Sequence, residues 1–80
     1  MDKEELLKEL NLIFIDIFED DSIVLKDTTT TEDIESWNSL NHIQMITAVE
    51  KRYKIRLNLH ELLNLKNVGD LCNVVLKAMN

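Results

Sequence analysis

Ser39 and His42 are the two residues of this sequence whose side chains could take part together in nucleophilic chemistry. Ser39 opens an apolar-periodic run, so its hydroxyl either marks the start of a helix or is kept free for a reaction. A serine nucleophile needs a base within hydrogen-bond reach and a third group that orients the base. His42 lies one helical turn after Ser39, but one short helix in an 80-residue chain leaves no room for an enclosed pocket. A small Ser/His hydrolase is therefore the weakest of the functions that we consider, and we predict no catalytic residue.

The other reactive side chains form no recognisable site in the sequence. Cys72 is the only cysteine, so it has no disulfide partner and no second thiol for zinc, and its apolar neighbours favour a core position. There is no glycine-rich phosphate loop, no HExxH pattern and no paired Cys/His set. We therefore expect no metal site.

Length and composition predict a single small helical domain, residues 1–80. The hydrophobic fraction is 45%, which is normal for a globular fold. The absence of proline and the single glycine favour helices over strands joined by tight turns. The N-terminal "MDKEELLKEL" is charged and amphipathic, which is typical neither of a signal peptide nor of a membrane span. Together with the lone cysteine, this pattern favours a reducing cytoplasm and no membrane insertion.

The charge of the chain is negative and unevenly placed. The net charge of −6 argues against nucleic acid and anionic membranes as partners, and it permits basic protein surfaces. A run of acidic residues is either a solvated loop, which we weight more heavily, or an electrostatic docking surface. The acids concentrated in one twenty-residue window are Asp16, Glu19, Asp20, Asp21, Asp27, Glu32, Asp33 and Glu35.

Apolar periodicity and capping residues predict four helices. The first runs over residues 2–18, and a long loop over residues 19–38 follows, attached to the core at Ile23, Leu25, Ile34 and Trp37. The second helix runs over residues 39–53 after an Asn38 cap, and "NLHELLN" predicts a short third helix capped by Asn58. The fourth begins at "NVGDL" with Asn67 as its cap. The expected fold is all-α, a small four-helix bundle with one long first connection.

The second helix is more apolar than one buried face requires. At about 100° per residue, its core stripe consists of His42, Met45, Ile46, Val49 and Tyr53. Leu40, Ile43 and Thr47 form a second stripe, separated from the first by more than about 100°. This second stripe is either part of a broad buried face or a binding surface that begins one residue after Ser39, and we favour the binding surface.

The run "DIESWNSLNHIQMITAVEKRYKI" resembles the region around the modified serine of acyl and peptidyl carrier proteins. Those proteins have Ser-Leu at the start of their second helix, then an apolar-periodic helix that ends in charged and aromatic residues, here "EKRYKIRL". The later "NVGDL" resembles the start of the family's last helix, so the match extends over nearly the whole chain. The tryptophan before Asn-Ser-Leu resembles stand-alone carriers of specialised pathways, such as D-alanyl carrier proteins.

The resemblance implies that Ser39 is the attachment point for 4′-phosphopantetheine, whose thiol holds an acyl or aminoacyl group as a thioester. It also implies three partners for a monomeric carrier: a phosphopantetheinyl transferase, an acyl- or aminoacyl-loading ligase and a downstream acyltransferase. A phosphodiester at a helix N-terminus meets unpaired backbone N–H groups and the positive end of the helix dipole. Because Asn38 can cap the helix, the Ser39 hydroxyl is left free to be modified.

The sequence departs from the family at positions that are usually acidic, because it has amides at Asn38, Asn41 and Gln44. Asparagine caps a helix as well as aspartate does, so the departure bears on recognition by enzymes rather than on folding. It leaves open an alternative function, an unmodified helical adaptor domain. The residues that we expect to contact partners are Trp37, Leu40, Asn41, Ile43, Gln44 and Thr47.

Overall fold

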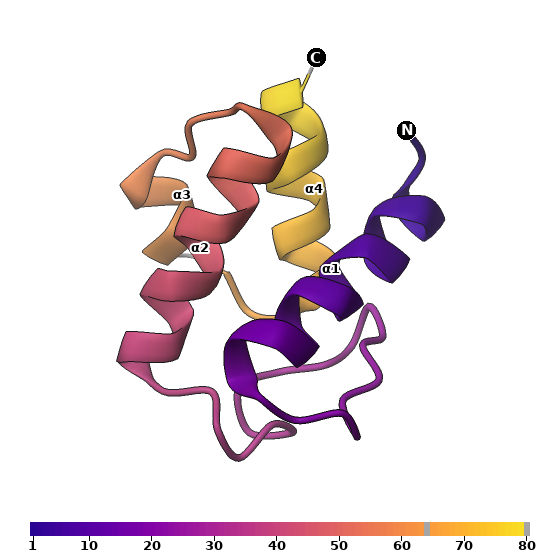
Figure 1. The fold of residues 1–80 in the computed structure, drawn as a ribbon. Helices are drawn as coiled ribbons and strands as arrows, with labels where there is room; N and C mark the ends of the chain where they lie inside the picture. The colour runs from indigo at the N-terminus through magenta and orange to yellow at the C-terminus, as the bar shows by residue number, and fades with distance from the viewer. Residues whose placement is uncertain (64, 80) are drawn as a thin grey trace.

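A computed structural model describes residues 1–63 and 65–79, with the side chains of Leu59 and Leu63 left outside the description. The described residues form four helices and no strand: α1 (Lys3–Phe18), α2 (Ser39–Tyr53), α3 (Leu59–Leu63) and α4 (Val68–Met79). Figure 1 shows α1, α2 and α4 around a common centre, with the long first loop crossing one end of the molecule. The predicted all-α class, the four helices and the long first connection are confirmed. Asn64, the last residue of the predicted third helical segment, lies outside the described residues.

Side chains cap the first turns of the helices: Asn67 caps α4 as predicted, and Asp2, the first residue of the predicted helix 2–18, is instead the cap of α1. The Glu5 N–H donates to Asp2 Oδ1 at 2.8 Å at the start of α1, and the Asp70 N–H donates to Asn67 Oδ1 at 2.9 Å in α4. Such caps accept one of the N–H groups that has no partner within its own helix. α1 and α2 each end at a residue in the left-handed conformation, Glu19 with φ 53° and Lys54 with φ 54°. Neither is glycine, so both helix ends form against a local backbone preference.

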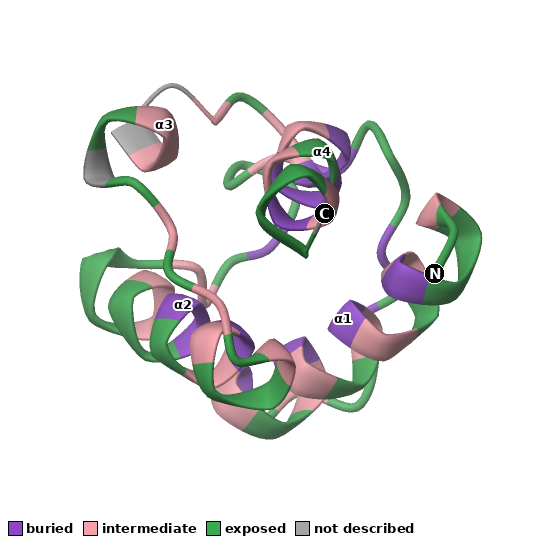
Figure 2. Ribbon diagram, turned by 90° about the horizontal axis from the view of Figure 1, so that it is seen from above, coloured by how far each residue is buried: buried purple, intermediate pink, exposed green. Residues whose placement is uncertain are grey.

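The core lies between α1, α2 and α4, whose buried faces point toward one another (Figure 2). Cys72 is fully buried in this core, as its apolar neighbours predicted, and burial raises the pKa of its thiol to about 11. The buried core residues of the three helices are Leu6, Leu10, Phe14, Phe18, Met45, Ile46, Val49, Val68, Leu71, Cys72 and Val75.

The long loop is attached to the core at the predicted points. Ile23, Leu25 and Ile34 are buried. The side chain of Asn11 on α1 holds the loop beside the first two, because its Nδ2 donates to the Ile23 carbonyl at 3.2 Å and its Oδ1 accepts from the Leu25 N–H at 2.6 Å. A loop of this length keeps one conformation only where its polar backbone groups find such partners.

The loop also covers the N-terminal end of α4. The Val68 N–H donates to the Thr29 carbonyl at 2.8 Å, and the Gly69 N–H donates to the Asp27 carbonyl at 2.9 Å. A Cβ at position 69 would lie 3.0 Å from that Asp27 oxygen, so any larger residue would push the loop backbone away by a few tenths of an ångström, and the close approach favours glycine. The single glycine of the chain is thus explained by packing. In the described part of the chain, no helix has the length and apolar character needed to cross a membrane.

Candidate functional site

Ser39 is the first residue of α2, at the end of the molecule where the loop joins the helix (Figure 1). Its side chain is exposed, and its hydroxyl makes no hydrogen bond within the part of the chain that the structure describes. The other two serines differ. Ser22 bonds the Asp20 carboxylate, and the Ser36 Oγ is buried. Ser39 therefore has the one serine hydroxyl that is both accessible and unengaged among the described residues.

The backbone around Ser39 has N–H donors that are available to bind an anion. Asn38 caps α2 as predicted, because its Oδ1 accepts from the Asn41 N–H at 2.9 Å and its carbonyl accepts from the His42 N–H at 2.9 Å. The N–H groups of Ser39 and Leu40 have no acceptor within the described residues. Two free donors at the positive end of a helix can bind a phosphate group at this position.

Trp37 fixes the segment that leads into Ser39. The indole is half-buried and packs edge-on against Phe14, with ring centroids 5.1 Å apart, and against Phe18 at 6.0 Å. Its Nε1–H donates to His42 Nδ1 at 3.0 Å, and the planes of the two rings are inclined by only 22° to each other. Trp37 thus connects the loop to both α1 and α2.

His42 is not placed to act as a base for Ser39. Its Nδ1 accepts the Trp37 indole N–H, so the ring is neutral with its proton on Nε2. Burial lowers the pKa of His42 below its usual value. Because the Ser39 hydroxyl makes no hydrogen bond to it, the dyad considered from the sequence is not formed in the described structure. The structure therefore offers no Ser39–His42 pair on which a hydrolase function could be based.

The two predicted stripes of α2 are separate in the structure. Met45 and Val49 are fully buried and Ile46 is 7% exposed, whereas Leu40 is 65% exposed and Ile43 is 64% exposed. Figure 2 shows the same division between the inner and outer faces of α2. The two outer ends of the core stripe, His42 and Tyr53, are half-buried. The exposure of Leu40 and Ile43 is confirmed, and their contact with a partner stays a prediction.

The other residues predicted to contact partners differ in their exposure and in their hydrogen bonds within the chain. Gln44 and Thr47 are exposed, although the Thr47 hydroxyl donates to the Ile43 carbonyl at 3.0 Å. Asn41 is half-buried, and its Nδ2 donates to the Ser36 carbonyl at 2.6 Å. Like Trp37, Asn41 has a partner within the chain. The Ser36 carbonyl was missed by sequence reasoning, because a backbone acceptor has no residue-type signal.

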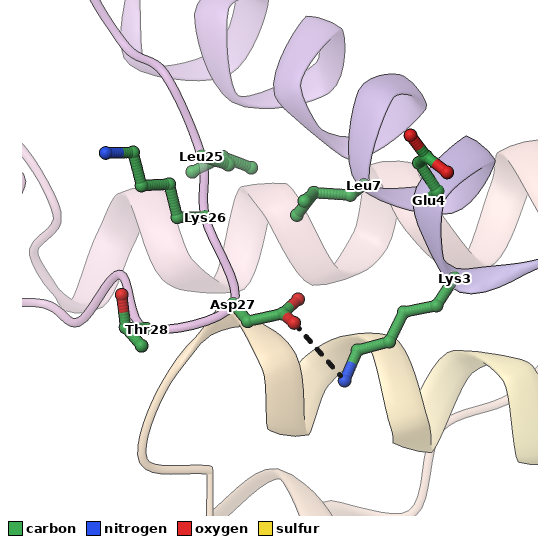
Figure 3. Close-up of a pocket in the computed structure, with 7 residues that line it drawn as sticks. All are labelled: Lys3, Glu4, Leu7, Leu25, Lys26, Asp27 and Thr28. Atoms are coloured by element: carbon green, nitrogen blue, oxygen red, sulfur yellow. Dashed lines mark ion pairs between the residues drawn. The ribbon is translucent and has the colours of Figure 1, made fainter.

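Two open grooves in the described part of the chain lie away from Ser39. Figure 3 shows an open groove of about 490 Å³ between the start of α1 and the loop, where Lys3 and Asp27 form an ion pair at 3.8 Å. This groove does not include Ser39. Its lining residues are Lys3, Glu4, Leu7, Leu25, Lys26, Asp27 and Thr28. Among the described residues, no three His, Cys, Asp or Glu side chains lie together in a way that could hold a metal ion.

Comparison with known proteins connects this geometry to a family. A family model described as a phosphopantetheine attachment site matches residues 13–75. A solved structure of the holo acyl carrier protein from Geobacter metallireducens superimposes with a TM-score of 0.86 and 48% sequence identity, over 91% of this chain and 84% of that one. No curated protein matches the chain. The family match over most of the chain and the shared fold show that this protein belongs to the acyl carrier protein family, whose prosthetic group is 4′-phosphopantetheine.

Proposed function

We propose that this protein holds an acyl or aminoacyl group on a 4′-phosphopantetheine arm attached to Ser39 and presents it to the enzymes of one pathway. The observation that carries the proposal is the exposed Ser39 hydroxyl without a hydrogen bond at the N-terminus of α2. Asn38 supplies the cap, so modification of Ser39 removes no hydrogen bond from the fold.

The residues around Ser39 fit a phosphodiester. The free N–H groups of Ser39 and Leu40 can donate to its oxygens, and in the described chain no acidic side chain lies in the first turn of α2 to repel it. When bound, the arm supplies a terminal thiol that holds the acyl or aminoacyl group. In the loading step a bond forms between Ser39 Oγ and the phosphorus next to pantetheine, and the P–O bond to the other half of the coenzyme A pyrophosphate breaks. Adenosine 3′,5′-bisphosphate leaves with the bonding electrons, and the hydroxyl proton passes to a base of the transferase. In this proposal the protein is a substrate of the loading and transfer enzymes.

The partners follow from this role. A phosphopantetheinyl transferase loads Ser39, a ligase loads the acyl or aminoacyl group, and an acyltransferase removes it. We expect these enzymes to contact the exposed apolar pair Leu40 and Ile43, and the loop segment between Asp27 and Glu35. The loop segment supplies the negative charge that the first three turns of α2 lack.

Intact mass spectrometry tests the proposal. The full chain is co-expressed with a broad-specificity phosphopantetheinyl transferase, and the wild type should gain the mass of one phosphopantetheinyl group. Ser39→Ala should gain none while losing well under ~1 kcal/mol of stability, because the cap is Asn38. Ser22→Ala is the matched control and should load as the wild type does. No mass gain on the wild type, together with a strong loss of stability in Ser39→Ala, would favour the unmodified adaptor.

A further inference from the structure

Two side chains in the first turn of α2 extend back to the loop segment just before Ser39. Asn41 Nδ2 donates to the Ser36 carbonyl at 2.6 Å. His42 Nδ1 accepts from the Trp37 indole N–H at 3.0 Å. Each bond connects residues five apart, so both bonds span Asn38 and Ser39 in the sequence. We call these two hydrogen bonds the loop anchor.

The loop anchor joins three parts of the molecule. The Ser36 carbonyl accepts a second bond, from the Asn38 N–H at 3.0 Å. Trp37 packs against Phe14 of α1, so its bond to His42 ties α2 to α1 through the loop. The Ser39 side chain makes no hydrogen bond of its own within the described residues, so its position depends on these neighbours.

We infer that Asn41 and His42 are positioning residues for the modification of Ser39: through the loop anchor they hold the chain on either side of the serine in one conformation. The inference rests on the proposed function, since it needs Ser39 to be the attachment point. A partner enzyme binds the ordered form of residues 36–39, and its apparent affinity falls by the fraction of molecules in which that segment is not ordered. A segment that becomes ordered only when the enzyme binds loses conformational entropy in that step, and a segment that is already ordered does not.

The loop anchor also gives a physical reason for an amide at position 41. The bond to the Ser36 carbonyl needs a donor, and the asparagine Nδ2 is a donor. An aspartate at position 41 would place a carboxylate oxygen, which only accepts hydrogen bonds, against the Ser36 carbonyl oxygen, which also only accepts, and the two would repel each other. Asn41 is thus committed to the loop, while Gln44 is exposed one turn later.

The test is steady-state kinetics of a broad-specificity transferase with coenzyme A and the full chain as substrate. His42→Phe keeps a ring beside Trp37 and removes the acceptor, and Asn41→Ala removes the donor. Either change should raise KM about three- to tenfold, the equivalent of one lost hydrogen bond, with kcat unchanged. His42→Asn, whose Oδ1 occupies the position of Nδ1, should restore a KM near that of the wild type.

Tyr53→Phe is the matched control. It removes a hydrogen bond of 2.7 Å to Glu9 at the other end of α2 and should leave KM unchanged. All variants are assayed below their melting temperatures. Hydrogen exchange of the Trp37 indole N–H with solvent is measured without any enzyme. The exchange should be faster in His42→Phe than in the wild type and unchanged in Tyr53→Phe. Wild-type KM in both anchor variants, or an equal rise in Tyr53→Phe, would overturn the inference and leave the proposed function intact. Absence of loading on the wild type would overturn both.

Discussion

At the scale of single residues, Ser36 has a buried hydroxyl without a hydrogen-bond partner, the one such side-chain atom among the described residues. Burying an unsatisfied hydroxyl costs about 1–3 kcal/mol. Ser36→Ala removes that hydroxyl and keeps the carbonyl that accepts from Asn41. We expect its free energy of unfolding to stay equal or to rise by up to about 1 kcal/mol in urea titrations. Ser22→Ala, which loses its bond to Asp20, should show no gain, and a clear loss of stability in Ser36→Ala would contradict the prediction.

His42 should make the stability of the protein depend on pH. Burial holds the folded-state pKa of His42 below its ordinary value of 6.5, so the unfolded chain takes up the proton first as pH falls. The free energy of unfolding should therefore be flat above pH 6.5 with respect to this group and fall below it, down to the folded-state pKa. Protonation also removes the acceptor for the Trp37 indole.

Urea titrations at several pH values, followed by Trp37 fluorescence, check this dependence. His42→Asn has no imidazole and should lose the part of the pH dependence that lies just below pH 6.5. Glu9 and Asp20 have pKa values lowered by hydrogen bonds to Tyr53 and Ser22, so their contributions are lost at lower pH and are shared by both proteins. Identical profiles for wild type and variant would show that His42 does not carry the effect.

At the scale of elements, α2 combines a structural face and an exposed apolar face. Ile46 is 7% exposed in the core and Ile43 is 64% exposed. Ile46→Ala should lower the free energy of unfolding by about 2–5 kcal/mol. Ile43→Ala should lower it by less than about 1 kcal/mol, and it should instead slow transfer to and from partner enzymes, because an apolar docking contact is lost. Thermal melts and transfer rates of the same two proteins separate the effects. Equal destabilisation by both changes would disprove the division of α2 into two faces.

At the scale of the whole molecule, charge is separated along α2. The stretch from Ser39 to Val49 has no charged residue, the acidic loop lies at its N-terminal end, and the basic residues Lys51, Arg52, Lys54 and Arg56 lie at its C-terminal end. Carrier proteins that resemble this one commonly present an acidic second helix to basic enzyme surfaces. A neutral helix offers less electrostatic attraction, which acts mainly on association rates and is screened over about 8–10 Å in physiological salt.

We therefore predict slow association with generic transferases and a gain on restoring acids. Asn38→Asp together with Gln44→Glu should raise the association rate at low salt, and the gain should shrink as salt rises. Asn41 is left unchanged because its amide donates to the Ser36 carbonyl. Asn73→Asp, an exposed change on α4, is the control and should have a smaller effect. Stopped-flow association rates against ionic strength provide the measurement. Equal rates and salt slopes for wild type and the double variant would place specificity in Leu40 and Ile43 alone.

The sequence by itself determined the features that depend on near neighbours in the chain. Helix bounds follow from periodicity and from caps such as Asn38 and Asn67, which bond N–H groups three residues away, and such local rules were enough to predict α2 as Ser39–Tyr53. The division of α2 into a buried and an exposed stripe followed in the same way from the helical repeat, and the apolar attachment points of the loop followed from isolated hydrophobic residues in a polar segment.

Only the tertiary structure decided how the side chains around Ser39 are used. Sequence spacing allowed a Ser39–His42 pair, but His42 bonds Trp37 instead, because Phe14 and Phe18 of α1 hold the indole beside it. The sequence predicted Asn41 to be a surface residue that contacts partners, yet the path of the loop places the Ser36 carbonyl oxygen 2.6 Å from Asn41 Nδ2. The path of a long loop depends on contacts with distant helices, and backbone acceptors leave no trace in residue type. These arrangements therefore could not be predicted from the order of the residues.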